Sequence, residues 1–489
     1  MLPLKFVAPL GVVAGGAMAL GQAPFSLWYV AFLGIVGVFW LFGQVTTTVR
    51  AALLGWLVGT AYFAGSLYWI MSPFQVDAAR HGWMAPFALA FLAGGLALLW
   101  SAGFAWARWT GGARAAGLML AIGWSGAELL RGYLFTGLPW GLVGYIWLDT
   151  PFAQIAADIG PYGLTLLTLV IAAGLASSRW LARIGAIAII ALAAALGIHR
   201  EAVPAAYAEA PARIRLVQTN AEQHLKWQPD MISVFWERNL ALTAQESDGL
   251  DLIVWPETAV PYLAENAAGA FDIMAQASGG VPIVAGIQRR DANGFYNSLV
   301  TLGDTGQVLA TYDKRHLVPF GEYMPGGALA SRLGLQGLAE QLGGGYTSGA
   351  EVELIDLPDV GNFLPLICYE AVFPRDLRVD GARPEWILHI TNDAWFGKKA
   401  GPYQHLAQAR MRAIEQGLPL VRAANTGVSA MIDPQGRVVA QLPLGVAGVL
   451  DVELPRPNPA TLFAKSGNLP MIALFLLSFL GLTLYRVRR

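Results

Sequence analysis

The chain has 489 residues, of which 55% are hydrophobic and only 13% are charged, and its mean hydropathy is +0.49. About a quarter of the residues of a soluble domain are charged, so this composition excludes a wholly soluble protein. It indicates an integral membrane protein with a soluble portion. The formal net charge of −1 gives no sign of nucleic-acid binding.

Apolar segments that approach the length of a bilayer span, about 20 residues, predict eight membrane spans. They lie at 6–22, 25–43, 51–71, 84–105, 115–135, 161–178, 182–198 and 468–485. The first could also be a signal peptide, because Ala17-Met18-Ala19 resembles a cleavage site. An uncleaved span is favoured, since Lys5 is the only basic residue before it and further spans follow at once.

Basic residues in the short loops predict the orientation of the spans. Arginines follow the even-numbered spans, whereas the loop at 136–160 has no cation. These arginines are Arg50, Arg108, Arg114, Arg179, Arg183, Arg486, Arg488 and Arg489. Both termini are therefore expected in the cytoplasm, and the long segment after the seventh span on the outer side. Within the fifth span, Glu128 and Arg131 are expected to pair with each other.

The segment from Arg213 to about Glu453 has short apolar runs that alternate with helical stretches at 229–247, 265–278 and 402–417. The runs predicted as strands are 214–218, 252–255, 281–287, 296–302, 308–312, 363–368, 386–391, 418–424, 429–432 and 438–442. Near-continuous apolar runs suit buried strands, and Trp255 and Trp386 are expected in the core. Roughly 240 residues suffice for one large α/β domain.

The predicted organisation is a seven-span domain at 1–200, a domain outside the membrane at 211–454 and a last span at 466–489. The segment 326–350 is rich in glycine and leucine with little charge. It is interpreted as a mobile lid that touches lipid or, alternatively, as a disordered connector.

Cys368 is the single cysteine of the chain, which excludes an intrachain disulfide. It is either a small buried hydrophobe or a nucleophile. Its position at the end of an apolar run, followed by a turn that contains the acidic residue Glu370, favours the nucleophile.

Two other reactive residues also follow predicted strands: Glu257 after the run at 252–255, and Lys314 after the run at 308–312. Strand ends are where α/β folds gather their sites. A carboxylate can take the thiol proton, while an ammonium together with the backbone N–H of Tyr369 can stabilise an oxyanion. Together the three residues favour catalysis.

Each residue also has a structural alternative. Glu257 could cap a following helix, and Lys314 could be a surface charge at a turn. His316 is expected to be a hydrogen-bonded turn residue rather than a metal ligand, because no second histidine or cysteine stands at ligand spacing. No metal and no cofactor is predicted.

Three motifs carry a resemblance to a known family: Trp255-Pro256-Glu257, Lys314 with Pro319-Phe320-Gly321-Glu322, and Ile367-Cys368-Tyr369-Glu370. They resemble the nitrilase superfamily, whose reactive trio is Glu, Lys and Cys. With the spans, and with further motifs at 217–227 and 391–397, nearly the whole chain resembles the apolipoprotein N-acyltransferase family. One departure is local: that family's first strand often continues Gly-Asn-Ile-Pro-Gln, where this chain has Thr-Asn-Ala-Glu-Gln at 219–223.

The resemblance implies a helical membrane domain followed by an α-β-β-α sandwich. It implies Glu257 as general base, Lys314 as oxyanion stabiliser and Cys368 as nucleophile. Supporting or substrate-handling roles are implied for Glu322, which would orient the lysine, and for Trp227, Tyr369, Glu370 and Trp395. Glu370 is also compatible with a purely structural role, and Trp227 with either a lid contact or a place in the core.

The implied reaction moves an acyl chain from a phospholipid, phosphatidylethanolamine being the expected donor, onto the cysteine as a thioester. The chain then passes to the α-amino group of the diacylglyceryl-cysteine of an apolipoprotein. The expected setting is the bacterial inner membrane, with the catalytic domain in the periplasm and the chain acting as a monomer. Two alternatives are a membrane-tethered amidase or nitrile hydrolase, which would not need eight spans, and a non-catalytic transporter or scaffold, against which the nearly charge-free spans argue.

Overall fold

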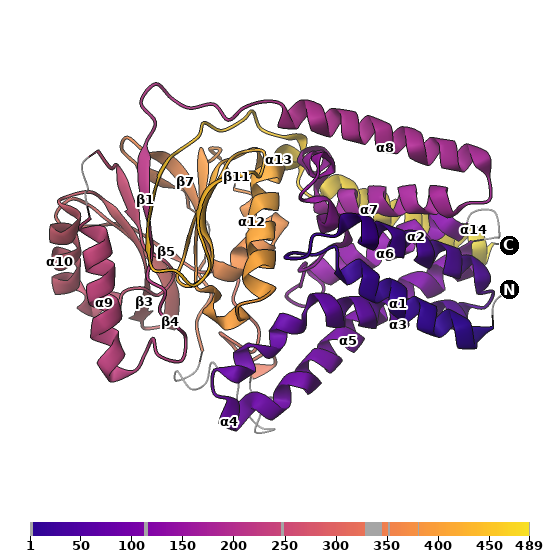
Figure 1. The fold of residues 1–489 in the computed structure, drawn as a ribbon, viewed down its shortest axis with the longest axis horizontal. Coiled ribbons are helices and arrows are strands. Elements are labelled where there is room, and N and C mark those ends of the chain that lie inside the picture. The colour runs from indigo at the N-terminus through magenta and orange to yellow at the C-terminus, as the bar shows by residue number, and fades with distance from the viewer. Residues whose placement is uncertain are drawn as a thin grey trace. The chain divides into compact units, whose positions relative to one another are not determined.

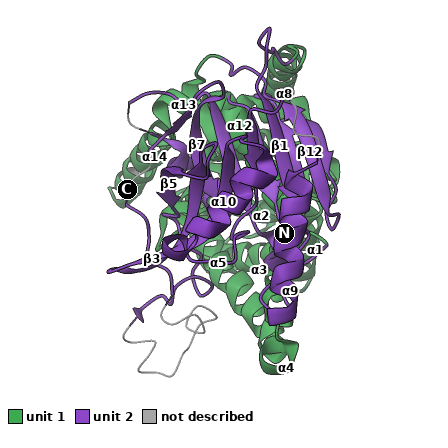
Figure 2. Ribbon diagram, turned by 90° about the vertical axis from the view of Figure 1, so that its left-hand side faces the viewer, with its two compact units in different colours: residues 1–204, 399–417, 459–489 green, residues 205–398, 418–458 purple. Residues whose placement is uncertain are grey.

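The computed structural model describes residues 3–111, 116–245, 249–327, 345–350, 353–379 and 381–488. The chain divides into two compact units, which Figure 2 shows in different colours. The helical unit comprises Met1–Pro204, Lys399–Gly417 and Pro459–Arg489. The sheet unit comprises Ala205–Lys398 and Leu418–Asn458.

The helical unit has an α-helix in each of the eight segments that the sequence predicts to be spans (Figure 1). These helices are α1 (Leu4–Ala19), α2 (Trp28–Gln44), α3 (Thr48–Ser66), α5 (Ala85–Thr110), α6 (Ala116–Tyr133), α7 (Ala156–Ala176), α8 (Trp180–Glu201) and α14 (Leu469–Val487). Two shorter helices, α4 (Ala78–His81) and α13 (Leu462–Ser466), precede α5 and α14.

The count of eight spans is not confirmed. Within the described residues, three helical stretches are long and apolar enough to cross a membrane: Ala78–Thr110, Pro151–Ala176 and Trp180–Glu201. A fourth is added if the bent pair Thr48–Ser66 and Tyr68–Gln75 forms one span. The apolar parts of α1, α2 and α14 are shorter, and a helix of about 17 residues reaches about 26 Å, less than the hydrocarbon core of about 30 Å.

The predicted pairing of Glu128 with Arg131 on α6 is confirmed. The two side chains are fully buried and lie 2.8 Å apart. Trp100 donates a hydrogen bond to Glu128, and Arg131 donates to the carbonyl oxygen of Trp140. These partners inside the protein offset much of the cost of burying two charges.

The helix predicted at 402–417 is α12 (Gly401–Gln416), and it groups with the helical unit although the sheet unit flanks it in sequence. Its buried polar side chains explain this. Gln404 accepts a hydrogen bond from Trp140 and donates one to the carbonyl oxygen of Ser66, while Arg412 donates to the hydroxyl of Tyr145. These contacts are between residues far apart in sequence, so the local pattern does not predict them.

The sheet unit contains two six-stranded sheets, ordered β12-β1-β2-β3-β4-β5 and β11-β10-β9-β8-β7-β6. The first is built from β1 (Arg213–Gln218), β2 (Leu252–Val254), β3 (Ile283–Asp291), β4 (Gly294–Leu302), β5 (Val308–Asp313) and β12 (Gly448–Glu453). The second is built from β6 (Ile355–Leu357), β7 (Gly361–Ile367), β8 (Trp386–Thr391), β9 (Leu420–Ala424), β10 (Ser429–Ile432) and β11 (Val438–Leu442). All ten runs predicted as strands form strands. Strands β6 and β12 were not predicted.

The two sheets are in contact, since Ser429 of β10 donates a 2.6 Å hydrogen bond to Gln218 of β1. Helices α9 (Pro229–Thr243) and α10 (Ala268–Ser278) lie together over the first sheet (Figure 1). Trp255 and Trp386 are fully buried, as predicted. The coarse architecture, a helical N-terminal region followed by a sheet domain, is therefore confirmed. Most of the segment interpreted as a lid, residues 328–344, lies outside the described residues.

Candidate active site

The three residues predicted to react all lie within three positions after the end of a strand. Glu257 comes after β2, Lys314 after β5 and Cys368 after β7. Strands β2 and β7 each have a parallel neighbour, so Glu257 and Cys368 stand at the carboxyl ends of parallel strands, where α/β folds place their sites.

Cys368 occupies a strained turn. Its φ of 51° is in the left-handed region, which non-glycine residues rarely adopt. There the chain leaves β7 and enters the short 3₁₀ helix η8 (Cys368–Val372). Such strain clusters at functional sites, and a sharp turn out of a strand is a known way to present a nucleophile.

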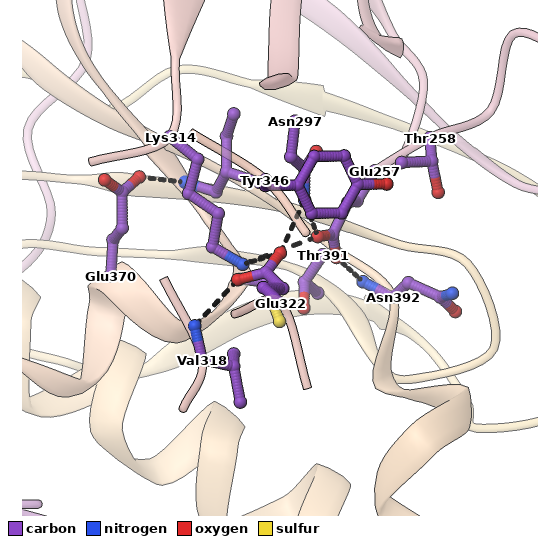
Figure 3. A network of polar contacts seen from close by, with 12 residues as sticks. Glu257, Thr258, Asn297, Lys314, Val318, Glu322, Tyr346, Glu370, Thr391 and Asn392 are labelled. Carbon is purple, nitrogen blue, oxygen red and sulfur yellow. Dashed lines mark hydrogen bonds and ion pairs between the residues drawn. The ribbon is translucent and has the colours of Figure 1, made fainter. Parts of the chain in front are cut away.

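Lys314 is buried among carboxylates and is not a surface charge, so that alternative is wrong. Its side chain is 1% exposed, and its Nζ lies 2.9 Å from Glu322 and 3.7 Å from Glu257 (Figure 3). Burial alone would lower the pKa of Lys314. The negative charges of Glu322 and Glu257, joined by that of Cys368 when its thiol is ionised, outweigh burial and raise the pKa above the usual lysine value, so the ammonium keeps its proton.

Two asparagines to which the sequence analysis gave no role hold the carboxylates. Asn297 Nδ2 donates to Glu257 at 2.7 Å and to Glu322 at 3.0 Å, so one amide orients both glutamates. The backbone N–H of Asn392 donates to the other oxygen of Glu257 at 2.7 Å. Glu257 is thus held by the site and does not cap a helix. The only sequence signal for Asn297 is a polar residue inside an apolar strand.

Cys368 is 5% exposed, and its surroundings disfavour a resting thiolate. Burial raises the pKa of the thiol, and the Glu257 carboxylate raises it further. Lys314 and a hydrogen bond with Thr391 oppose these effects without cancelling them, so the pKa lies above the usual thiol value. The sulfur therefore needs a base to take its proton before it can attack.

Lys226 is a further buried amine beside Glu257. Its Nζ donates to the carbonyl oxygen of Glu257 at 3.2 Å and to the hydroxyl of Thr258 at 2.8 Å. Burial lowers the pKa of Lys226 to about 8, although Glu257 opposes the shift. The predicted residue Trp227 is next in sequence and is 43% exposed, with the Lys226 ammonium 5.3 Å from its ring centroid.

The other predicted supporting residues lie around η8 and β8. Tyr369 is buried, with its ring edge-on to His316 and Phe373. Trp395 is partly exposed in the short 3₁₀ helix η10 (Asp393–Phe396). His316 is the hydrogen-bonded turn residue that was predicted, since its Nδ1 lies 2.8 Å from Asp376. Over the described ranges, no group of three or more histidine, cysteine or acidic residues could hold a metal ion.

Glu370 ties the turn after β7 to the segment after β5. It is 1% exposed. One carboxylate oxygen accepts from the Tyr312 hydroxyl at 2.7 Å and from the Arg315 N–H at 2.8 Å. The other accepts from the Ile367 N–H at 2.7 Å. Burial raises the pKa of Glu370, and these donors oppose the shift. The side chain thus braces the loops that carry Lys314 and Cys368.

Replacing Glu370 by Gln is expected to lower the free energy of unfolding by about 3 kcal/mol, because the amide NH₂ cannot accept from donors that now face a carboxylate oxygen. Denaturant unfolding of the protein in detergent, followed by tryptophan fluorescence, measures this free energy. Glu385→Gln at an exposed position is the matched control. Equal midpoints for the two variants would contradict the bracing role.

Comparison with known proteins assigns the family. The model of the carbon-nitrogen hydrolase family matches residues 206–460, and that of the apolipoprotein N-acyltransferase N-terminal domain matches residues 14–174. A relative named apolipoprotein N-acyltransferase, from Rhodopseudomonas palustris, is 39% identical over 96% of this chain and 93% of its own length. The chain belongs to the apolipoprotein N-acyltransferase family.

Other apolipoprotein N-acyltransferases match at similar length. The one from Bradyrhizobium diazoefficiens is 38% identical over 97% of this chain and 94% of its own, and the one from Brucella melitensis is 37% identical over 98% and 96%. A solved CN-hydrolase superfamily protein from Xanthomonas campestris aligns with 54% of this chain and 96% of its own at 23% identity, with a TM-score of 0.37. The assignment to the apolipoprotein N-acyltransferase family does not depend on that likeness.

Proposed function

We propose that this chain transfers an acyl chain from a phospholipid to the α-amino group of the S-diacylglyceryl-cysteine of apolipoproteins, through a thioester on Cys368. The observation that carries the proposal is the ammonium of Lys314, buried between Glu257 and Glu322 beside the strained turn of Cys368. The family match to both parts of the chain supports a lipid-linked substrate and makes a soluble-type amidase the weaker alternative.

In the first half-reaction, Glu257 takes the proton of the Cys368 thiol and the sulfur attacks the ester carbonyl carbon. Lys314 and the backbone N–H of Tyr369 stabilise the oxyanion. The intermediate then collapses, the lysophospholipid alkoxide leaves with the proton from Glu257, and the acyl thioester remains. The hydrogen bonds of Glu322 and Asn297 hold the side chains of Lys314 and Glu257 in position during this step.

In the second half-reaction, the α-amine of the apolipoprotein attacks the thioester carbonyl. Glu257 takes a proton from the nitrogen, the amide forms and the thiol is restored. The kinetics should be ping-pong. Water must be kept from the thioester between the two steps, and we assign this exclusion and the binding of substrate to Tyr369, Trp227, Trp395 and the 326–350 segment.

The proposed setting is the bacterial inner membrane, with eight helices anchoring a periplasmic catalytic domain of α-β-β-α type and the chain acting as a monomer. Phosphatidylethanolamine is the proposed donor. Both substrates have lipid chains in the bilayer, and removing a lipid chain from a bilayer costs about 0.8 kcal/mol for each CH₂. An enzyme anchored in the same bilayer avoids that cost.

Trapping the acyl-enzyme tests the proposal. Purified full-length protein incubated with phosphatidylethanolamine should gain the mass of one acyl chain, and hydroxylamine should remove it. Cys368→Ala should gain no mass, and added diacylglyceryl peptide should discharge the wild-type adduct into an N-acylated product. Persistent acyl loading of Cys368→Ala, or discharge only to free fatty acid, would overturn the assignment.

A further inference from the structure

A row of three buried polar side chains ends at the backbone carbonyl of Cys368 and has no part in the mechanism above. It consists of His389 on β8, Arg422 on β9 and Asp393 in η10, each with no solvent exposure. His389 and Arg422 are register partners on adjacent parallel strands. The row ends on the reactive residue, because His389 Nε2 lies 3.0 Å from the carbonyl oxygen of Cys368.

The partners of His389 determine its tautomer. Its Nδ1 lies 2.8 Å from Nη1 of Arg422, and a guanidinium nitrogen can only donate, so Nδ1 accepts. The neutral ring then carries its hydrogen on Nε2 and donates it to the Cys368 carbonyl. Arg422 is itself held by Asp393, whose Oδ2 lies 2.5 Å from Nη2. The guanidinium of Arg422 therefore donates to both the Asp393 carboxylate and the His389 ring, and His389 in turn donates to the peptide carbonyl of Cys368.

That carbonyl belongs to the Cys368–Tyr369 peptide, whose N–H is the oxyanion donor of the proposed mechanism. A peptide group is planar, and in the trans form its C=O and N–H point in opposite directions. Holding the oxygen on the His389 side therefore fixes the direction of the Tyr369 N–H. A hydrogen bond to the oxygen also polarises the peptide and makes its N–H a stronger donor.

We infer that His389, backed by Arg422 and Asp393, is a positioning residue that aims and strengthens the Tyr369 N–H in the oxyanion hole. The inference rests on the proposed function, since it concerns the donor in that reaction. It also gives a reason for burying an arginine, a histidine and an aspartate together beside the nucleophile: a strained turn persists only where the surrounding structure holds it, and the row does so.

Two substitutions separate the contacts of His389. In His389→Gln the amide lies at the distance of Nε2, so it can still donate to the Cys368 carbonyl. In His389→Asn the amide lies at the distance of Nδ1, so it keeps the contact with Arg422 but cannot reach the carbonyl. Two rates are compared in the full-length protein: acyl loading of Cys368 from phosphatidylethanolamine, and alkylation of Cys368 by iodoacetamide at the same pH. Alkylation forms no oxyanion, so the oxyanion hole does not affect it.

We expect His389→Asn to load acyl groups about tenfold more slowly, because losing an oxyanion donor outright costs about 10²–10³ and here the donor is only misaligned and weakened. Its alkylation rate should be unchanged, and His389→Gln should match the parent in both rates. Acyl loading by His389→Asn at the parental rate, or an equal fall in both of its rates, would overturn the inference.

If His389→Asn does not accumulate in membranes, His389→Gln decides alone. Parental acyl loading by that variant supports the inference, and slow loading with normal alkylation overturns it. A parent protein that forms no acyl-enzyme would instead refute the proposed function itself, so the two failures are distinguishable.

Discussion

Replacing Lys314 by Met is expected to reduce acyl transfer by at least about 10²–10³, because the oxyanion loses its only charged donor in the proposed site. The same change leaves Glu257 and Glu322 sharing one amide of Asn297 with no cation between them. Breaking a buried ion pair by removing one partner costs about 3–5 kcal/mol, so stability should fall as well. Single-turnover acyl loading and denaturant unfolding measure the two effects.

The matched control is Lys398→Met, which removes a lysine whose side chain is 76% exposed and paired with Glu222 at 3.0 Å. An exposed pair contributes about 0–1 kcal/mol, so this variant should load acyl groups and unfold like the parent. If Lys314→Met and Lys398→Met were equally active, Lys314 would have no part in the chemistry.

Replacing Glu257 by Gln is expected to slow acyl transfer by Cys368 and, in the opposite direction, to speed alkylation of Cys368. Acyl transfer should fall by about 10²–10⁴, because the general base is lost. The thiol itself should ionise more easily, since the Glu257 carboxylate raises the pKa of Cys368 and the amide does not, while Lys314 still lowers it. At a fixed mildly alkaline pH, iodoacetamide should therefore alkylate the variant faster than the parent.

This opposite response separates a base from a structural group. A residue needed only for folding would lower both rates when replaced. Glu237→Gln at an exposed position of α9 controls for the loss of one carboxylate and should change neither rate. Slower alkylation of Glu257→Gln would mean that Glu257 does not disfavour the thiolate, and the charge balance described for the site would be wrong.

The predicted site residues came from local sequence, and the structure brings their core together. Glu257, Lys314 and Cys368 each follow a strand that its own apolar run predicts, so the strand ends could be located without the fold. Asn297 and Asn392 could not be found in this way. They reach Glu257 from 40 and 135 positions away in sequence, and neither belongs to a pattern that indicates a carboxylate partner.

The same contrast applies to the fold. The ten predicted strands are apolar runs, but β12 pairs with β1 across the whole sheet unit, and its residues are largely exposed or partly exposed. The helix α12 has a clear helical pattern, yet its place in the helical unit depends on the hydrogen bonds of Gln404 and Arg412 with residues more than 200 positions away.

Composition and local patterns predict that the chain enters a membrane, where ten of its strands lie and which three residues are candidates for the chemistry. Those properties depend on composition, on periodicity and on neighbours along the chain, because the local spacing of apolar residues predicts which side chains are buried. Which donor faces which carboxylate, the left-handed φ of Cys368 and the contact of His389 with the Cys368 carbonyl are visible only in the folded chain. These features depend on which distant strands pair and in which register. Only that pairing brings donors and acceptors within hydrogen-bond distance of each other.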